Sequence, residues 1–259
     1  MVVSLDEILG FIYVVSWSIS MYTPVVTNWR LKSSSAISSD FVILNTVGYF
    51  YLTISLYLQL HSWMSPVKNY ELNTITEDDI SRPKVTDFDL IYTTHGLILN
   101  LVLLSQVRYP KLWRFNSEKH SRMKPSYKKF LISSLTVFVL ITIHFYYDIQ
   151  TYGWNNNDIL SYCNKLFTLK LFMSLIKYIP QVKHNYERKT MKGFSIKGVL
   201  LDAVGGIASL LQLILELYYE DGFTFVIFIT NFGKIGLGLV TLVFDFIFIS
   251  QWSLYRKIK

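Results

Sequence analysis

The stretch KYIPQVKHNYERKTMKGFSIKGVLLDAVGG (residues 177–206) places one acidic residue, Asp202, inside an apolar segment that follows a basic loop. In a bilayer, a charged side chain near the centre of a helix costs about 2.5–3.5 kcal/mol on insertion scales. A soluble core also penalises an unpaired carboxylate. An acidic residue at this position therefore either has a function or pairs with a basic residue. The surrounding sequence shows whether it lies in a membrane or in a soluble core.

The composition indicates a membrane protein. Apolar side chains make up 51% of the 259 residues and the mean hydropathy is +0.33, which is high for a soluble domain. Apolar runs of about 20 residues match the thickness of a bilayer core, where the backbone must form helices. Runs of this kind occupy residues 8–27, 41–63, 88–107, 130–150, 159–182, 199–217 and 223–252. The last run is long and contains Asn231, Gly233 and Lys234, so its first third is expected to be irregular.

Basic side chains are unevenly distributed among the connecting loops. They gather after the first, third and fifth runs and at the C-terminus, whereas the loop after the second run is mainly acidic. The positive-inside rule therefore places the C-terminus in the cytosol and the N-terminus outside the cell or in a lumen. The net charge of +7 then reflects membrane topology, so membrane lipid is an expected partner and nucleic acid is not.

The sequence contains an internal repeat. A shift of 157 positions lays the first helix–loop–helix on the fifth and sixth apolar runs without a gap. The coinciding pairs include Asn28 with Asn185, Lys32 with Lys189, Ser38 with Ser195, Val42 with Val199 and Gly48 with Gly205, and Asn45 falls on Asp202. Because an even number of spans separates the two copies, both are expected to have the same orientation in the membrane.

The expected fold is all-α, with seven transmembrane helices in two parallel three-helix repeats joined by an inverting linker helix, as in the SWEET transporters. The first bundle is expected over residues 1–110, the basic loop and linker helix over 111–155, and the second bundle over 156–259. Substrate sites of such folds lie between the repeats. Asn45 and Asp202 are therefore expected to face each other across a central cavity.

Several segments, in order, resemble the cystinosin family of lysosomal proton-coupled cystine exporters. They are WSISMYTPVVTNWR (17–30), DFVILN (40–45), DLIYTTH (89–95), the opening stretch, KIGLG (234–238) and FDFIFISQWSLYRK (244–257). The resemblance implies a PQ-loop transporter that works by alternating access. Its expected substrates are cystine, or a related amino acid, and protons, which it would move from a lysosome, vacuole or endosome to the cytosol.

The resemblance also assigns site residues. It places proton-coupling acids at Asp202 and Asp89, and substrate-binding residues at Asn45, Lys170, Lys177, Asn185, Asp202 and Lys234. The expected hinges are Pro24, Pro180 and Gln181, since a proline inside a helix removes a backbone donor. The chain departs from the family at two places. Thr23-Pro24 occupies the first Pro-Gln position, and Gly198 stands where the family has a substrate-site asparagine.

The residues alone leave structural alternatives open. Asp202 begins a face of small residues at helical spacing, which suits a cavity wall, but it could also pair with Lys170 or Lys177. Asp89 could be an N-terminal helix charge favoured by the dipole. Lys177 lies near enough to the end of its run to snorkel. Asp245 is interpreted as a partner for basic residues at the cytosolic end.

Other functional classes remain open. A pH-dependent sorting receptor or signalling scaffold, as in the KDEL receptors, would need the same buried acids and cations. A sugar facilitator would not need them, and the ordered segments favour the transporter. No nucleophile–base pair or metal cluster is evident, so no enzyme, metal or cofactor is expected. The single cysteine, Cys163, excludes an internal disulfide.

Overall fold

The computed structural model describes residues 5–64, 83, 85–116, 123–216, 218 and 232–256. Within these ranges the regular structure is helical and contains no strand. The elements are α1 (Leu5–Leu31), α2 (Ser39–His61), α3 (Asp87–Arg108), η1 (Pro110–Trp113), α4 (Pro125–Tyr152), α5 (Asn156–Arg188), α6 (Ile196–Glu216) and α8 (Phe232–Arg256).

Seven of the described helices are long and apolar enough to cross a membrane, which confirms the expected all-α membrane fold. Some helices extend past their apolar runs. α4 begins at Pro125, whose fixed φ suits a first helical turn. α5 begins after Asn155, whose side chain accepts the N–H of Asp158 at 2.8 Å. The irregular segment expected at the start of the last run falls mainly on residues 223–231, which lie outside the described residues.

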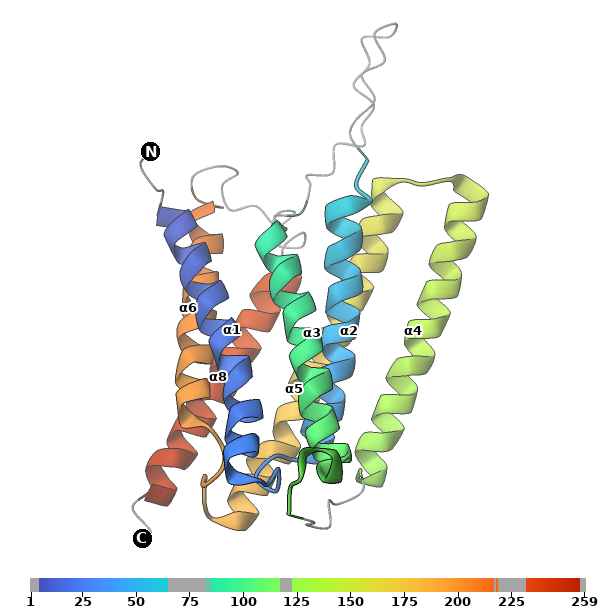
Figure 1. Cartoon of the computed structure of the whole chain (residues 1–259). Helices are drawn as coiled ribbons and strands as arrows, with labels where there is room; N and C mark the ends of the chain where they lie inside the picture. The colour runs from blue at the N-terminus through green and yellow to red at the C-terminus, as the bar shows by residue number, and fades with distance from the viewer. Residues whose placement is uncertain are drawn as a thin grey trace, which may run out of the picture.

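The helices form one bundle in which consecutive helices run in opposite directions (Figure 1). α1 packs against α6 and α2 against α5, so contacts between the two repeats hold the bundle together. α3 lies against α1 and α2, and α8 lies against α5 and α6. α4 packs on α5 at the edge of the bundle, and Ser134 is its one buried residue. The remaining apolar surface of α4 suits contact with lipid.

One end of the bundle is strongly basic. α1, α3, α5 and α8 all finish there, at the bottom of Figure 1, and each has an arginine in its last turn. We call it the basic end. Because a cation near a helix C-terminus interacts favourably with the helix dipole, these arginines also stabilise the four helix ends.

The turns after α1 and α5 repeat the same geometry 157 positions apart. Each begins with a lysine in the left-handed region, Lys32 or Lys189, with φ of 50° in both cases. Beyond each turn, the carbonyl groups of Ser38 and Ser195 accept the N–H of the residue four positions later, each at 3.2 Å. The repeat seen in the sequence is therefore present in the backbone.

A polar lock between two helices also occurs in both halves. In the first half, Asn28 Nδ2 donates to Gln106 Oε1 at 3.1 Å, and Gln106 Nε2 donates to the Val25 carbonyl at 3.1 Å. The bonds of the second half are Asn185 Nδ2 to Gln251 Oε1 at 3.2 Å and Gln251 Nε2 to the Val182 carbonyl at 3.0 Å. These equivalent bonds tie α1 to α3 and α5 to α8. The residue boundaries of the two bundles stay a prediction.

A second set of bonds crosses between the halves at the basic end. Gln181 Nε2 on α5 donates to the Ala36 carbonyl at 3.1 Å, and Gln181 Oε1 accepts the Ser38 N–H at 2.9 Å. We call this pair of bonds the Gln181 latch. Its repeat equivalent would need a polar side chain at position 24, but Pro24 stands there. The two repeats therefore cannot be latched in the same way.

Candidate substrate cavity

A cavity of about 220 Å³ lies between the two repeats. All the described transmembrane helices except α4 contribute to its lining. Most of the lining is apolar or aromatic. The ionisable and amide side chains among the lining residues include Asn45, Gln59, Asp89, Asn100, Lys170, Lys177, Asp202 and Asp245. Five of the expected proton-coupling and substrate-binding residues therefore share one cavity, and the expected hinge Pro24 lines it as well.

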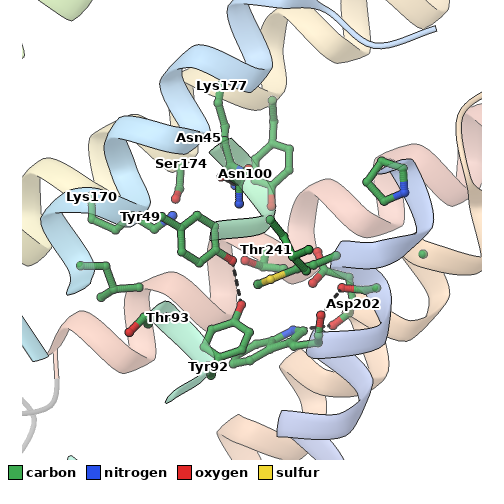
Figure 2. A pocket seen from close by; sticks show the side chains of 18 of the residues that line it. Asn45, Tyr49, Tyr92, Thr93, Asn100, Lys170, Ser174, Lys177, Asp202 and Thr241 are labelled. Carbon is green, nitrogen blue, oxygen red and sulfur yellow. Dashed lines mark hydrogen bonds between the residues drawn. The ribbon is translucent and has the colours of Figure 1, made fainter. Parts of the chain in front are cut away.

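Lys177 and Asn45 connect the two halves inside this cavity (Figure 2). The Lys177 ammonium group, on α5, donates to Asn45 Oδ1, on α2, at 2.6 Å. Asn45 Nδ2 donates to Asn100 Oδ1 at 2.6 Å, and Asn100 Nδ2 donates to the Gly96 carbonyl at 2.8 Å. Because its ammonium group is bonded to Asn45 and only 6% of the residue is exposed, Lys177 does not snorkel.

Lys170 lies two helical turns from Lys177 and is 4% exposed. Its Nζ atom stands 4.2 Å from the ring centroid of Tyr49. Tyr49 and Tyr92 share a hydroxyl–hydroxyl hydrogen bond of 2.8 Å, drawn as a dashed line in Figure 2. Neither tyrosine was predicted as a site residue from the sequence. The only available signal was that Tyr49 follows Asn45 by one helical turn, on the same face.

Asp202 lies on α6 and lines the cavity, as expected. Its carboxyl group interacts electrostatically with Lys177 and Lys170 and is within hydrogen-bonding reach of the Ser20 hydroxyl. Its backbone carbonyl accepts the indole N–H of Trp17, on α1, at 3.0 Å. Asp202 and Asn45 line the same cavity, and Lys177 is a neighbour of both.

Asp245 corrects one sequence interpretation. It lines the cavity and is 2% exposed, and its charge interacts with Asp202 and Lys177. Its Oδ2 atom is buried and has no hydrogen-bond partner among the residues that the structure describes. Asp245 is therefore not a partner for the basic loops. The expected run ended at residue 252, whereas α8 continues to Arg256, which leaves Asp245 deeper in the bundle than the sequence indicated.

Asp89 lines the cavity and also caps α3. Its Oδ2 atom accepts the N–H and the hydroxyl of Thr86 at 3.0 and 2.9 Å, while the Thr86 side chain accepts the Asp89 N–H. This reciprocal arrangement is a capping box. Asp89 Oδ1 also accepts the Tyr13 hydroxyl at 2.8 Å. Capping is thus a role that Asp89 has in the structure, and its part in proton coupling stays a prediction.

The other two expected substrate-binding residues, Asn185 and Lys234, are not among the lining residues that the structure describes. Asn185 is fully buried but does not line the cavity; it bonds Gln181 at 2.9 Å and Gln251 at 3.2 Å near the basic end. In this conformation the Asn185 amide is occupied within the lock, and its contact with substrate stays a prediction. Lys234 falls in α8, but its side chain lies outside the described part of the structure.

The expected hinge prolines, Pro24 and Pro180, both lie inside helices, α1 and α5. The two departures from the family are in contact with each other. Thr23 and Gly198 both line the cavity, and a Cβ atom at position 198 would collide with the Thr23 hydroxyl. The threonine in the first motif therefore requires the glycine in the sixth helix, and the two changes form one packing unit between α1 and α6.

Comparison with known proteins gives relatives along the whole chain. A family model described as PQ loop repeat matches residues 162–221. The chain is 55% identical over 256 residues to a protein of Saccharomyces cerevisiae named cystine transporter, covering 98% of this chain and 95% of that one. It is 33% identical to cystinosin of Bos taurus, with 98% and 64% covered. It is 31% identical to a cystinosin homolog of Dictyostelium discoideum, with 97% and 82% covered.

Proposed function

The chain belongs to the cystinosin family, and on this premise we propose that it exports cystine, or a related amino acid, together with protons. The route runs from an acidic lysosome, vacuole or endosome to the cytosol by alternating access. The name of the yeast relative supports cystine as the substrate. The observation that carries the proposal is the cavity between the repeats, which holds two lysines and three aspartates away from the lipid.

The charges in the cavity match an amino acid. Lys170 and Lys177 offer ammonium groups to a substrate carboxylate, and Asp202 and Asp245 offer carboxyl groups to a substrate ammonium group. A buried charge is costly unless it is paired. A zwitterionic substrate supplies the missing partners on both sides, which a neutral sugar does not. This difference favours amino-acid transport over a sugar facilitator.

In the proposed mechanism, protons are coupled to transport because Asp202 and the substrate carboxylate compete for Lys170 and Lys177. When Asp202 is ionised, it attracts Lys177 and Lys170. A proton taken up by Asp202 removes this attraction and leaves the lysines available to a substrate carboxylate. Loss of the proton on the cytosolic side restores the attraction and displaces the carboxylate. Asp245 interacts with the same groups, so it joins Asp202 in this coupled set. Asp89, at the far end of the cavity, is a further proton-binding candidate.

The basic end is assigned to the cytosol by the positive-inside rule. There, aromatic residues line the cavity, including Phe41, Tyr178, Phe194 and Phe248. Opening requires α1 and α5 to change shape near the basic end, and Pro24 and Pro180 are the positions that lack a backbone donor there. The two hydrogen bonds of the Gln181 latch must break in the same step.

The test is uptake of labelled cystine into vesicles that carry the full chain with its lumenal face outward. We expect saturable uptake that is faster at acidic than at neutral external pH. Lys170→Ala should weaken apparent affinity with little change in surface expression, and Lys170→Arg should restore it only in part, because the planar guanidinium has a different shape. Saturable cystine binding without uptake would favour the sorting receptor. Uptake with no pH dependence would overturn the coupling.

A further inference from the structure

We propose that Tyr49 is a positioning residue that aims the Lys170 ammonium group at the substrate. The inference rests on the proposed function, in which Lys170 binds a substrate carboxylate. Lys170 belongs to the second repeat and Tyr49 to the first, so the contact joins the two repeats at the cavity wall. Because a lysine side chain is flexible, a lysine that binds substrate must have its ammonium group held in one position.

The contact between the two residues is close and desolvated. Lys170 Nζ stands 4.2 Å from the Tyr49 ring centroid, within the range of a cation–π interaction. Tyr49 is 8% exposed and Lys170 is 4% exposed, so little water competes for the ammonium group. The ring face thus holds the Lys170 ammonium group at one position on the cavity wall without neutralising its charge. A carboxylate partner in the same place would compete with the substrate.

The Tyr49 ring is itself held from two sides. A Cβ atom at Gly96, on α3, would lie 2.6 Å from Tyr49 Cε1, so the ring edge sits directly on the α3 backbone. The Tyr49 hydroxyl bonds the Tyr92 hydroxyl at 2.8 Å, as Figure 2 shows. Glycine at position 96 makes room for the ring, and the hydroxyl bond sets its orientation.

Tyr92 is fixed in turn by the first helix. Its ring stacks on Trp17 with centroids 5.0 Å apart and an interplanar angle of 30°. The Trp17 indole N–H donates to the Asp202 carbonyl at 3.0 Å. Lys170, Tyr49, Tyr92, Trp17 and Asp202 therefore form a chain of contacts across five helices. These contacts connect the Lys170 ammonium group to the backbone carbonyl of Asp202.

Three substitutions separate the ring from the hydroxyl bond. Tyr49→Leu removes both. Tyr49→Phe and Tyr92→Phe each keep a ring and delete the same hydrogen bond. In the uptake assay, Tyr49→Leu should raise the KM for cystine by about fivefold to thirtyfold and change the maximal rate little, as expected for a lost desolvated cation–π contact. Tyr49→Phe and Tyr92→Phe should raise KM less, by equal amounts, and the double Phe variant should match either single one.

A positioning role acts through Lys170, which gives a second criterion. In a Lys170→Ala background, Tyr49→Leu should leave KM within about twofold of Lys170→Ala alone, because there is no ammonium group left to aim. An equal KM increase in both backgrounds would overturn the proposal, as would an unchanged KM in Tyr49→Leu. If Tyr49→Leu does not reach the membrane, Tyr49→Met takes its place, because it fills the space without an aromatic face.

A measurement that does not depend on transport separates this proposal from the proposed function. If the wild type takes up no cystine, the proposed function fails, and the question about Tyr49 is decided by amine acylation of the purified full chain. Mass spectrometry gives the rate at each lysine. Without the ring that stabilises its charged form, Lys170 should be acylated several times faster in Tyr49→Leu, while Lys177 is unchanged. Equal Lys170 rates in the two proteins would overturn the proposal.

Discussion

Asp202 shares its cavity with two lysines and two further carboxyl groups, so under the proposed function its charge decides which cations remain for a substrate. Lys177 also bonds Asn45, the repeat equivalent of Asp202. One repeat thus offers Lys177 a neutral amide, and the other offers it a carboxyl group that can gain or lose a proton. Of the two equivalent positions, Asn45 and Asp202, only Asp202 can gain or lose a proton, although the fold around them is nearly symmetric.

The Asp202→Asn substitution should abolish the pH-driven part of cystine uptake. Asparagine resembles the protonated acid in shape and charge, and Asn45 shows that the fold accepts an amide at the equivalent position. The variant should therefore fold, reach the membrane and still bind or exchange cystine. Recording of substrate-evoked proton current gives the answer. A current of wild-type size would move the coupling to Asp245 or Asp89, while Asp148→Asn, on α4 and outside the cavity, is a control expected to transport normally.

The sequence identified most of the charged residues of the cavity and Asn45, but it missed the aromatic residues and Asn100. Lys170, Lys177 and Asp202 stand out because a charge inside an apolar run is rare and costly. Tyr49 and Asn100 give no such signal, since aromatic residues make up 16% of the chain and polar residues are not unusual in helices. Their roles depend on which faces of α2 and α3 meet, and only tertiary packing sets that.

At the scale of the helix pair, α1 and α6 are in close contact where Thr23 meets Gly198. Gly198→Ala should destabilise the protein, because overpacking of a close contact costs about 1–3 kcal/mol. Adding Thr23→Ala should recover most of the loss, since it removes the hydroxyl that the new methyl group would strike. Thermal unfolding in detergent measures both effects. Val204→Ala, on the exposed face of α6, is the matched control. A double variant no more stable than Gly198→Ala would contradict the paired packing.

The Gln181 latch gives a prediction for the turn between α1 and α2. Gln181→Leu should loosen this turn, because the Ser38 N–H and the Ala36 carbonyl lose their partner, and an unsatisfied buried group costs about 1–3 kcal/mol. With Cys163→Ser as background, an Ala36→Cys reporter should react faster with a thiol reagent applied from the basic end.

The matched control for the latch is Gln251→Leu, which breaks the lock between α5 and α8 without touching the turn that holds Ala36. In the Gln251→Leu variant, the Ala36→Cys reporter should react at the same rate as in the Cys163→Ser background without a change at position 181 or 251. Equal acceleration in both variants would mean that the basic end loosens as a whole and that the latch has no separate role. Because Pro24 replaces the equivalent glutamine, no substitution at position 24 can remove a latch from the other repeat.

At the scale of the molecule, much of the fold could be predicted from two regular features of the sequence. The apolar runs fixed the number and order of the spans, and the 157-residue repeat fixed which spans are equivalent. Helix ends were predicted less well, because α4 and α5 continue into polar residues where proline and asparagine, not hydrophobicity, set the first turn. The depth of Asp245 was misjudged for the same reason.

The orientation of the bundle is the last prediction, and it follows from charge alone. α1, α3, α5 and α8 all end at the basic end, so an odd number of spans separates the two chain termini. The positive-inside rule then puts the C-terminus in the cytosol. A reporter fused after Lys259 should be cytosolic, and a glycosylation or protease site inserted near Thr76 should be lumenal. Both reporters on one side would refute the odd number of spans. Exchanged sides would keep the fold but overturn the assignment of the basic end to the cytosol.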